Sequence, residues 1–259
     1  MGWFQVTRGF FADLFLAIRV AWFPTFTTVF HTPSLLFKPR ELSRIFMSHV
    51  WSVYGDGVDQ NSHKVKTELV TPRAKGIVLD IGAGHGHLIN YLDKTQVTAY
   101  FALEPNLMMH KHIIDKAHAA GFREEDGTLL IIPCPLENIN DICAHISQWS
   151  QRYTPSDSGK IVPNQKSEKQ EGGQFLFYEH VRNPSHQIAR LQDVVAPIWR
   201  IFFDGCLIGQ DSVKIIEEAG QYRPGETLWS DSIVWGNEEE DRNSLFWHQV
   251  GYCLKKIDH

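Results

Sequence analysis

A short apolar run followed by a glycine-rich turn is the feature that most restricts the fold of this 259-residue chain. Ile77–Leu79 is rich in β-branched residues and suits a buried parallel strand. Gly82, Gly84 and Gly86 follow at alternate positions, and Leu88 begins a predicted short helix. A strand, a glycine turn and a helix in this order let a cofactor approach backbone N–H groups at the start of the helix. The pattern therefore predicts an α/β domain with a cofactor site at this turn.

Two acidic residues accompany the glycine turn. Asp80 precedes Gly82 by two positions, and Glu104 ends a second apolar run that begins at Val97. An acid at the carboxyl end of the second strand of such a fold is placed to accept both hydroxyls of a ribose. A dinucleotide fingerprint would need a third glycine where His87 stands, which disfavours a nicotinamide oxidoreductase.

This DxGxGxG arrangement resembles motif I of the class I S-adenosylmethionine (SAM) methyltransferases. The resemblance implies a Rossmann-like sheet of strand order 3-2-1-4-5-7-6 with SAM as the cofactor. It also implies that the acid binds the amino group of SAM, that the glycines admit its amino-acid end, and that the loop after the third predicted strand, Thr128–Ile132, holds adenine. The implied cofactor-binding residues are Asp80, Gly82, Gly84, Gly86, Glu104, Pro105, Leu136 and Glu137.

The central fourth strand of that fold is missing from the sequence pattern. The fifth strand is predicted within Gly172–Val181, but the apolar run Ile142–Trp149 fits a helix as well as a strand. Residues 151–173 are mostly polar and are predicted to be a disordered insertion. Either the 142–149 run takes the place of the fourth strand or that place is empty, as in a mistaken gene model or a splice form. An empty place would leave the methyl-transfer side of the pocket incomplete.

The last third of the chain carries a closer resemblance. The string Glu-His-Val at 179–181, a helix from Ile188, the Phe-Asp-Gly-Cys string at 203–206 and a terminal His-x-x-Gly-Tyr at 248–252 resemble the microsomal thiol methyltransferases, which are methyltransferase-like proteins of the type-11 domain class. The resemblance implies a thiol acceptor and membrane attachment through the N-terminus. Thr227–Trp235 and the 246–255 run predict a final hairpin whose acidic loop is solvated.

The N-terminal segment is rich in aromatic residues, since 13 of the 31 in the chain lie within residues 1–54. The longest uncharged run, Val20–Phe37, has 18 residues and is interrupted by Pro24 and Pro33, so it is a marginal membrane span. An interfacial segment and a hydrophobic arm that covers the domain both remain open. A helix is predicted within residues 38–71, ending at Gly55–Gly57. We thus predict an arm over residues 1–71 and a methyltransferase domain over 72–259.

Charge and cysteine content indicate which partners and which compartment to expect. The net charge of −5 provides no basic footprint for nucleic acid. Four separated cysteines without a CxxC pair indicate neither a metal site nor a disulfide framework, which favours a reducing compartment. We therefore expect an intracellular protein, in the cytoplasm or on the cytosolic face of an internal membrane.

The sequence offers two candidate catalytic residues. His180 follows the fifth predicted strand, on the side where a parallel α/β sheet carries its site, and Asp204 is the second candidate. The methyl group of SAM is already electrophilic, so alignment in a dry pocket supplies much of the catalysis and a base is optional for a thiol. The sequence predicts a SAM-dependent methyltransferase acting on a small, apolar acceptor. The alternative is a non-catalytic, membrane-associated protein that retains part of the fold.

Overall fold

The computed structural model describes residues 3–153, 172–223, 226–237 and 240–256. The chain folds as two compact units, one formed by residues 55–171 and the other by residues 1–54 together with 172–259. We call them the central unit and the terminal unit. The domain boundary predicted at residue 71 stays a prediction.

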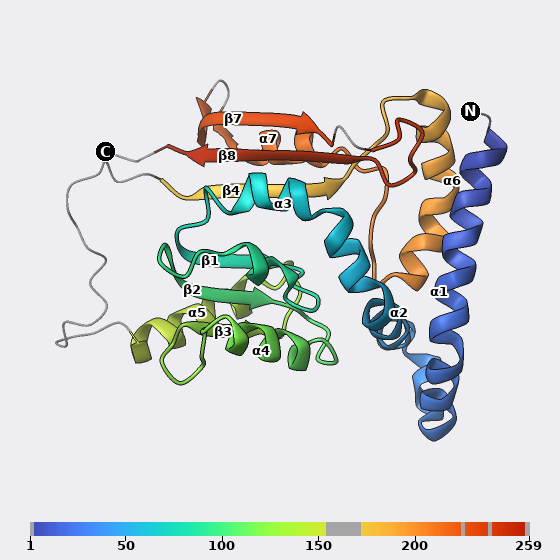
Figure 1. Ribbon diagram of the computed structural model, residues 1–259, viewed down its shortest axis with the longest axis horizontal. Helices are drawn as coiled ribbons and strands as arrows, with labels where there is room; N and C mark the ends of the chain where they lie inside the picture. Colours follow the sequence, from blue (N-terminus) through green and yellow to red (C-terminus); the bar gives the residue numbers. More distant parts are fainter. Residues whose placement is uncertain (1–2, 154–171, 224–225, 238–239, 257–259) are drawn as a thin grey trace. The chain divides into compact units, whose positions relative to one another are not determined.

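A parallel three-stranded sheet forms the centre of the central unit (Figure 1). Its strands are β1 (Gly76–Ile81), β2 (Val97–Leu103) and β3 (Leu129–Ile132), which lie in the order β1-β2-β3. Six of the seven β2 residues are buried, as expected for the middle strand of a covered parallel sheet. The predicted α/β class and the 3-2-1 half of the predicted strand order are confirmed.

No strand lies between β3 and the next strand, β4, within the described residues of that interval. The ambiguous 142–149 run belongs to the helix α5 (Ile139–Tyr153). The Trp149 side chain fixes this helix to the unit, because its Nε1 donates to the Gly127 carbonyl at 2.8 Å and its ring meets that of Phe101. The predicted disorder is wrong for residues 151–153, which are helical, and residues 154–171 lie outside the described part.

Two helix predictions in this part of the chain need correction. The helix α2 (Pro39–Asn61) continues through Gly55 and Gly57, and α3 (His63–Val70) follows it. The segment after the glycine turn forms only a five-residue 3₁₀ helix, η2 (His87–Tyr91). It ends at Leu92, whose extended backbone stops any further turn, so the short helix predicted from Leu88 is present as a 3₁₀ helix rather than an α-helix. The sequence also predicts a helix over Leu107–Ala120, and the next helix, α4 (His110–Ala119), lies within that range.

The terminal unit contains an antiparallel sheet of strand order β4-β8-β7, whose three strands are labelled in Figure 1. The strands are β4 (Gln174–His180), β7 (Trp229–Gly236) and β8 (His248–Lys255). This order matches the predicted 5-7-6 half of the sheet. The remaining elements here are α6 (His186–Phe202), α7 (Ser212–Ala219), β5 (Gln221–Arg223) and β6 (Glu226–Thr227).

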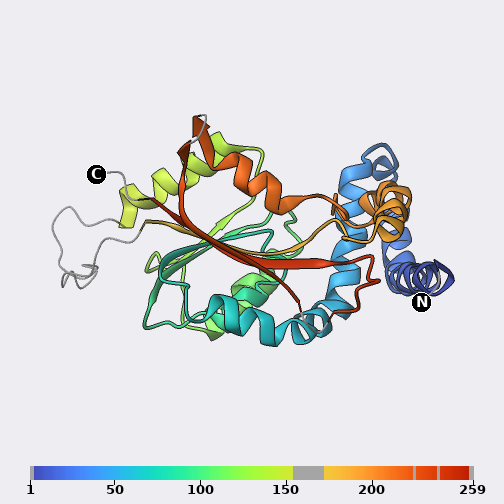
Figure 2. The same cartoon turned by 90° about the horizontal axis from the view of Figure 1, so that it is seen from above.

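The N-terminal helix α1 (Trp3–His31) lies alongside α6 in both views, and η1 (Pro33–Phe37) follows it (Figures 1 and 2). Phe10 joins an apolar cluster with Ile188, Leu191 and Val195 of α6. About two and three turns further on, Ala17 and Ala21 pack in a second cluster with Phe46. One stripe of α1 is therefore part of the core of the terminal unit.

Candidate functional site

The glycine turn after β1 meets the acid after β2 at the carboxyl edge of the parallel sheet. Gly84 has a φ of 54°, and its backbone N–H donates to Glu104 Oε2 at 2.8 Å. The N–H of Gly82 donates to the Leu103 carbonyl at 2.9 Å, which fixes the start of the turn to the end of β2. The structure thus brings together two of the motifs that the sequence singled out.

Glu104 is held at this edge by its backbone and its side chain. The residue is only 7% exposed, and its second carboxylate oxygen, Oε1, accepts the Asn106 N–H at 2.8 Å. His110 Nε2 lies 2.7 Å from the Glu104 carbonyl, so this nitrogen carries the donated proton. The two hydrogen bonds from backbone N–H groups to the carboxylate are charge-assisted. Such bonds are about twice as strong as neutral ones, and here they fix the direction of the carboxylate.

Asp80 lies on β1, the strand next to the one that Glu104 follows, and its side chain contacts a fully buried tyrosine. Its Oδ2 accepts a hydrogen bond of 2.6 Å from the hydroxyl of Tyr100, a residue with no exposed surface. Burial raises the pKa of Asp80 to about 6, although the Tyr100 hydroxyl and the charge of Lys66 act in the opposite direction. The carboxylate therefore changes its charge close to neutral pH.

Two histidines of the turn are buried and differ in their partners. His87 Nε2 lies 2.7 Å from Asp56 Oδ1, and Lys116 reaches the same oxygen at 3.3 Å. The ring of His85 stacks on that of His112 at 3.9 Å, and burial lowers the pKa of His85 to about 4. His85 is therefore neutral at physiological pH. Beside His87 is a pocket of about 330 Å³, whose other lining residues are Asp56, Asp59, Gln60, His63 and Asn90.

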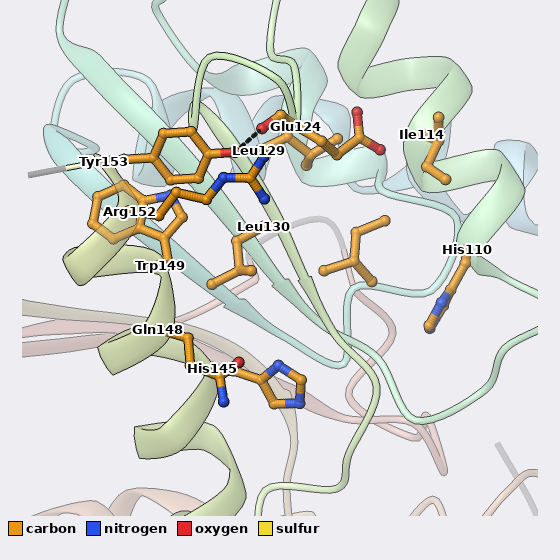
Figure 3. A pocket seen from close by; sticks show the side chains of 11 residues that line it. His110, Ile114, Glu124, Leu129, Leu130, His145, Gln148, Trp149, Arg152 and Tyr153 are labelled. Atoms are coloured by element: carbon orange, nitrogen blue, oxygen red, sulfur yellow. Dashed lines mark hydrogen bonds between the residues drawn. The ribbon is translucent and has the colours of Figure 1, made fainter.

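The residues predicted to hold adenine are more exposed. Pro105 is half-buried next to Glu104, whereas Leu136 is 49% exposed and Glu137 is exposed. A separate pocket of about 470 Å³ lies between α5 and the edge of β3 (Figure 3). Its apolar part is formed by Leu129, Leu130, Ile131 and Ile114, and its aromatic part by Trp149 and Tyr153. Leu136 and Glu137 do not line it.

His180 ends β4 in the terminal unit, opposite His248 of β8. Burial, together with the nearby His248, lowers the pKa of His180 to about 3, so its imidazole is a weak proton acceptor at neutral pH. His248 is the better-oriented imidazole, because Glu240 accepts from its Nδ1 at 2.9 Å and from its backbone N–H at 2.8 Å. Glu240 belongs to the loop predicted as solvated, and its side chain is only 10% exposed.

Asp204 occupies a turn after α6 with a φ of 50°, a left-handed conformation that few non-glycine residues adopt. Its backbone N–H donates to Ser43 Oγ at 3.0 Å, and its carboxylate lies 3.6 Å from Arg44 Nε. Burial raises the pKa of Asp204, and Arg44 partly offsets this. These contacts give the residue a structural function in its turn, and the catalytic functions of His180 and Asp204 stay predictions.

Sequence reasoning missed four residues that shape these sites: Tyr100, Asn106, Glu240 and His248. Two of them had a signal in or beside a motif: Asn106 follows the Glu104-Pro105 pair directly, and His248 begins the His-x-x-Gly-Tyr string. Tyr100 lies in the middle of a predicted strand, where an aromatic residue is ordinary core. In the described residues, no group of three His, Cys, Asp or Glu side chains is arranged to hold a metal ion.

The Glu104 contacts make a direct prediction. We expect Glu104→Gln to destabilise the central unit by about 1.5–3 kcal/mol, the usual worth of a hydrogen bond to a charged group, because an amide cannot accept from both N–H groups. Urea unfolding at neutral pH measures this loss. As a control, Glu137→Gln changes an exposed acid and should leave the unfolding midpoint in place. Equal stability of the Glu104 variant and the wild type would contradict the geometry described for this turn.

Comparison with known proteins gives structural likenesses only. No protein-family model matches the chain, and the search of curated proteins found no match. An O-methyltransferase family protein from Burkholderia thailandensis is similar with a TM-score of 0.45 and 11% identity over 85% of this chain, and the match spans 60% of that protein. A SAM-dependent methyltransferase of the DUF858 family from Leishmania major is similar with a TM-score of 0.44 and 17% sequence identity, and the match covers 84% of this chain and 82% of that one. CurJ carbon methyltransferase is similar with a TM-score of 0.40 and 12% sequence identity, and the match covers 90% of this chain and 70% of that one.

Proposed function

We propose that this chain is a SAM-dependent methyltransferase that acts on a small, apolar acceptor through a thiol or another heteroatom. The observation that carries the proposal is the 2.8 Å hydrogen bond from the Gly84 N–H to Glu104. This bond joins the glycine turn to the acid expected to bind a ribose, at one edge of the sheet. Ligands of open α/β sheets bind at the carboxyl ends of the strands. The four separated cysteines without a CxxC pair support an intracellular protein, which we also propose.

The glycine turn offers space for such a cofactor. A Cβ placed on Gly82 would meet nothing within 4 Å, whereas one on Gly86 would approach Ile113 Cα to 3.2 Å. The turn is therefore packed against α4 on the Gly86 side and open on the Gly82 side. Glu104, with both oxygens directed by N–H donors, is suited to a ribose, and Asp80 is suited to an ammonium group.

When bound, SAM supplies an electrophilic methyl group on a sulfonium. The residues of the chain then bind and orient rather than activate. Glu104 would bind the ribose hydroxyls, and Asp80 would neutralise the ammonium of the amino-acid end. The open space beside Gly82 would let the cofactor come close to the backbone of the turn. Such alignment can supply a large part of the barrier reduction in methyl transfer.

Calorimetric titration of the purified full chain with SAM tests the proposal. We expect saturable binding with a stoichiometry of one, and binding of S-adenosylhomocysteine at the same site. Methyl transfer is then followed with radiolabelled SAM and 1-hexanethiol, an apolar thiol. No heat at high micromolar SAM would exclude the proposed function.

A non-catalytic, membrane-associated protein is the second candidate, and two observations favour it. The described residues between β3 and β4 contain no strand that could complete the sheet, and α1 exposes large apolar side chains. Binding of SAM without transfer to any apolar thiol, alcohol or amine would favour this candidate over the enzyme.

The exposed face of α1 supports contact with a membrane surface. Phe11, Phe15, Trp22, Phe26 and Phe30 recur at helical spacing and are each more than half exposed. By length and composition Val6–His31 could cross a membrane, which by itself is a weak indication. Because the opposite stripe with Phe10, Ala17 and Ala21 is packed on the terminal unit, we propose that α1 lies along the surface of the membrane instead.

A triple substitution separates the two faces of α1. We expect Phe11→Ser, Phe15→Ser and Phe26→Ser together to reduce flotation with phosphatidylcholine vesicles by at least about 100-fold in partition coefficient, since each buried Phe contributes about 1.5–3 kcal/mol. Deleting residues 1–37 is a poorer test, because it would remove Phe10, Ala17 and Ala21 from the core.

The matched control changes three exposed apolar residues outside α1, namely Val194→Ser, Ile201→Ser and Ile215→Ser. This variant should float as the wild type does. Equal flotation of both triple variants, or a wild type that stays with the soluble fraction, would exclude membrane contact through α1.

A further inference from the structure

The Tyr100 hydroxyl contacts Asp80, a proposed cofactor-binding residue, and has no place in the function so far. Tyr100 pairs with Val78 in the sheet register, and Asp80 pairs with Ala102. Tyr100 and Asp80 are therefore diagonal neighbours on one face of two adjacent parallel strands. A tyrosine can reach across such a diagonal, and the 2.6 Å contact shows that it does.

The direction of this hydrogen bond is fixed by the environment. Burial of the phenol, together with the nearby Asp80 and Glu104, raises the pKa of the Tyr100 hydroxyl well above its ordinary value, so the hydroxyl stays protonated. It therefore donates, and Asp80 Oδ2 accepts. A donor favours the ionised form of a carboxylate, whereas burial opposes that form.

The charged groups that act on Asp80 come from two elements. Tyr100 approaches from β2, and Lys66 acts from α3 through its charge alone. Lys66 is itself bound to Asp59 at 2.6 Å, and Tyr91 donates to the same Asp59 oxygen at 3.0 Å. Tyr100 is thus the only group that the described residues place in hydrogen-bond contact with Asp80 Oδ2.

We propose that Tyr100 is a positioning residue for cofactor binding, whose hydroxyl holds Asp80 ionised and directed toward the ammonium of the amino-acid end of SAM. This inference rests on the proposed function. Cofactor affinity then follows the charge of Asp80, rising with pH as that carboxylate loses its proton. Removing the hydroxyl moves the rise to higher pH while leaving the adenosine contacts intact.

The test is the affinity of S-adenosylhomocysteine, which is stable across the pH range, measured by calorimetry from pH 5 to 9. In Tyr100→Phe the midpoint of the affinity rise should move upward by about one to two pH units, the worth of one hydrogen bond to a charged group. At pH 7 the variant should bind about 2- to 10-fold more weakly than wild type, and at pH 9 nearly as well. A loss of packing would weaken binding at both pH values.

Two controls make the result specific. 5′-Methylthioadenosine lacks the amino-acid end, so its affinity should be independent of pH in this range and unchanged in Tyr100→Phe. Tyr91→Phe removes the hydroxyl of another buried tyrosine, one that donates to Asp59 instead of Asp80, and its midpoint should match wild type.

The outcomes separate the inference from the function on which it rests. A shared midpoint for wild type and Tyr100→Phe, or an affinity loss that persists at pH 9 and includes 5′-methylthioadenosine, would overturn the positioning function of Tyr100. A wild type that binds S-adenosylhomocysteine at no pH would overturn the proposed function itself. An upward shift seen only with S-adenosylhomocysteine supports both.

Discussion

Replacing Gly82 with leucine is expected to abolish SAM binding while the protein still folds. The Cβ direction of Gly82 leads into space with no atom within 4 Å, so the new side chain would occupy the room that a cofactor needs. The cost to the fold is the left-handed backbone, since Gly82 has a φ of 72°, and this amounts to about 1–2 kcal/mol. Calorimetric titration with SAM, together with urea unfolding, measures both effects.

Gly76 provides a matched control within the same strand. It has a φ of 65°, its Cβ would also meet nothing within 4 Å, and it lies at the opposite, amino end of β1. Gly76→Leu should therefore lose a similar amount of stability and keep its affinity for SAM. Gly86 is unsuitable, because a Cβ there would press on Ile113. If both leucine variants bind SAM equally well, the glycine turn is not the cofactor site.

The strands and their order could be predicted because their signals are local. The three strands of the parallel sheet are short, mostly apolar runs. The middle strand β2, which is buried on both faces, is the clearest case of the near-continuous apolar run typical of a covered parallel strand. Motif spacing then supplied the relation between Gly84 and Glu104, which is twenty positions in sequence and one hydrogen bond in space. The local signals left the Ile142–Trp149 run open between helix and strand, and only the structure assigns it to α5.

The errors at α2 and η2 come from contacts that sequence spacing does not show. Gly55 and Gly57 each cost a helix about 1 kcal/mol, which predicts a stop. The helix continues, and Asp56 and Asp59 on its last turns meet His87 and Lys66. These ion pairs exist only if the helix runs to Asn61. Local propensity was therefore outweighed by tertiary contact.

The partners of the site residues were equally hidden. Whether Tyr100 reaches Asp80 depends on the register of β1 against β2, and a shift by one residue would turn the tyrosine to the other face. From sequence alone, Glu240 is interpreted as part of a solvated acidic loop tip. In the structure the hairpin places its carboxylate against His248. A single sequence shows which residues lie on a strand, and only the structure shows what they face.

Neutralising Asp80 is expected to stabilise the protein while it weakens SAM binding. The pKa of Asp80 is raised from 3.8 to about 6 by burial, so the ionised form is disfavoured in the folded state. Below pH 3.8 the carboxyl is protonated in both states and costs nothing. As pH rises, the unfolded chain releases this proton first, and stability falls until the folded carboxyl has also ionised above pH 6. The difference between the two pKa values corresponds to about 3 kcal/mol.

Asp80→Asn removes this penalty, since an amide stays neutral and its oxygen can still accept from Tyr100. Urea unfolding should show a gain of up to about 3 kcal/mol at pH 8 that vanishes near pH 4. Asp93→Asn is the control of opposite sign: the Thr95 hydroxyl and N–H lower the pKa of Asp93, so its ionised form stabilises the fold at pH 8. That variant should lose stability at pH 8 and lose less at low pH. A residue that weakens the fold when charged is retained for binding rather than for folding, and an Asp80→Asn variant with unchanged stability at pH 8 and unchanged SAM affinity would contradict that conclusion.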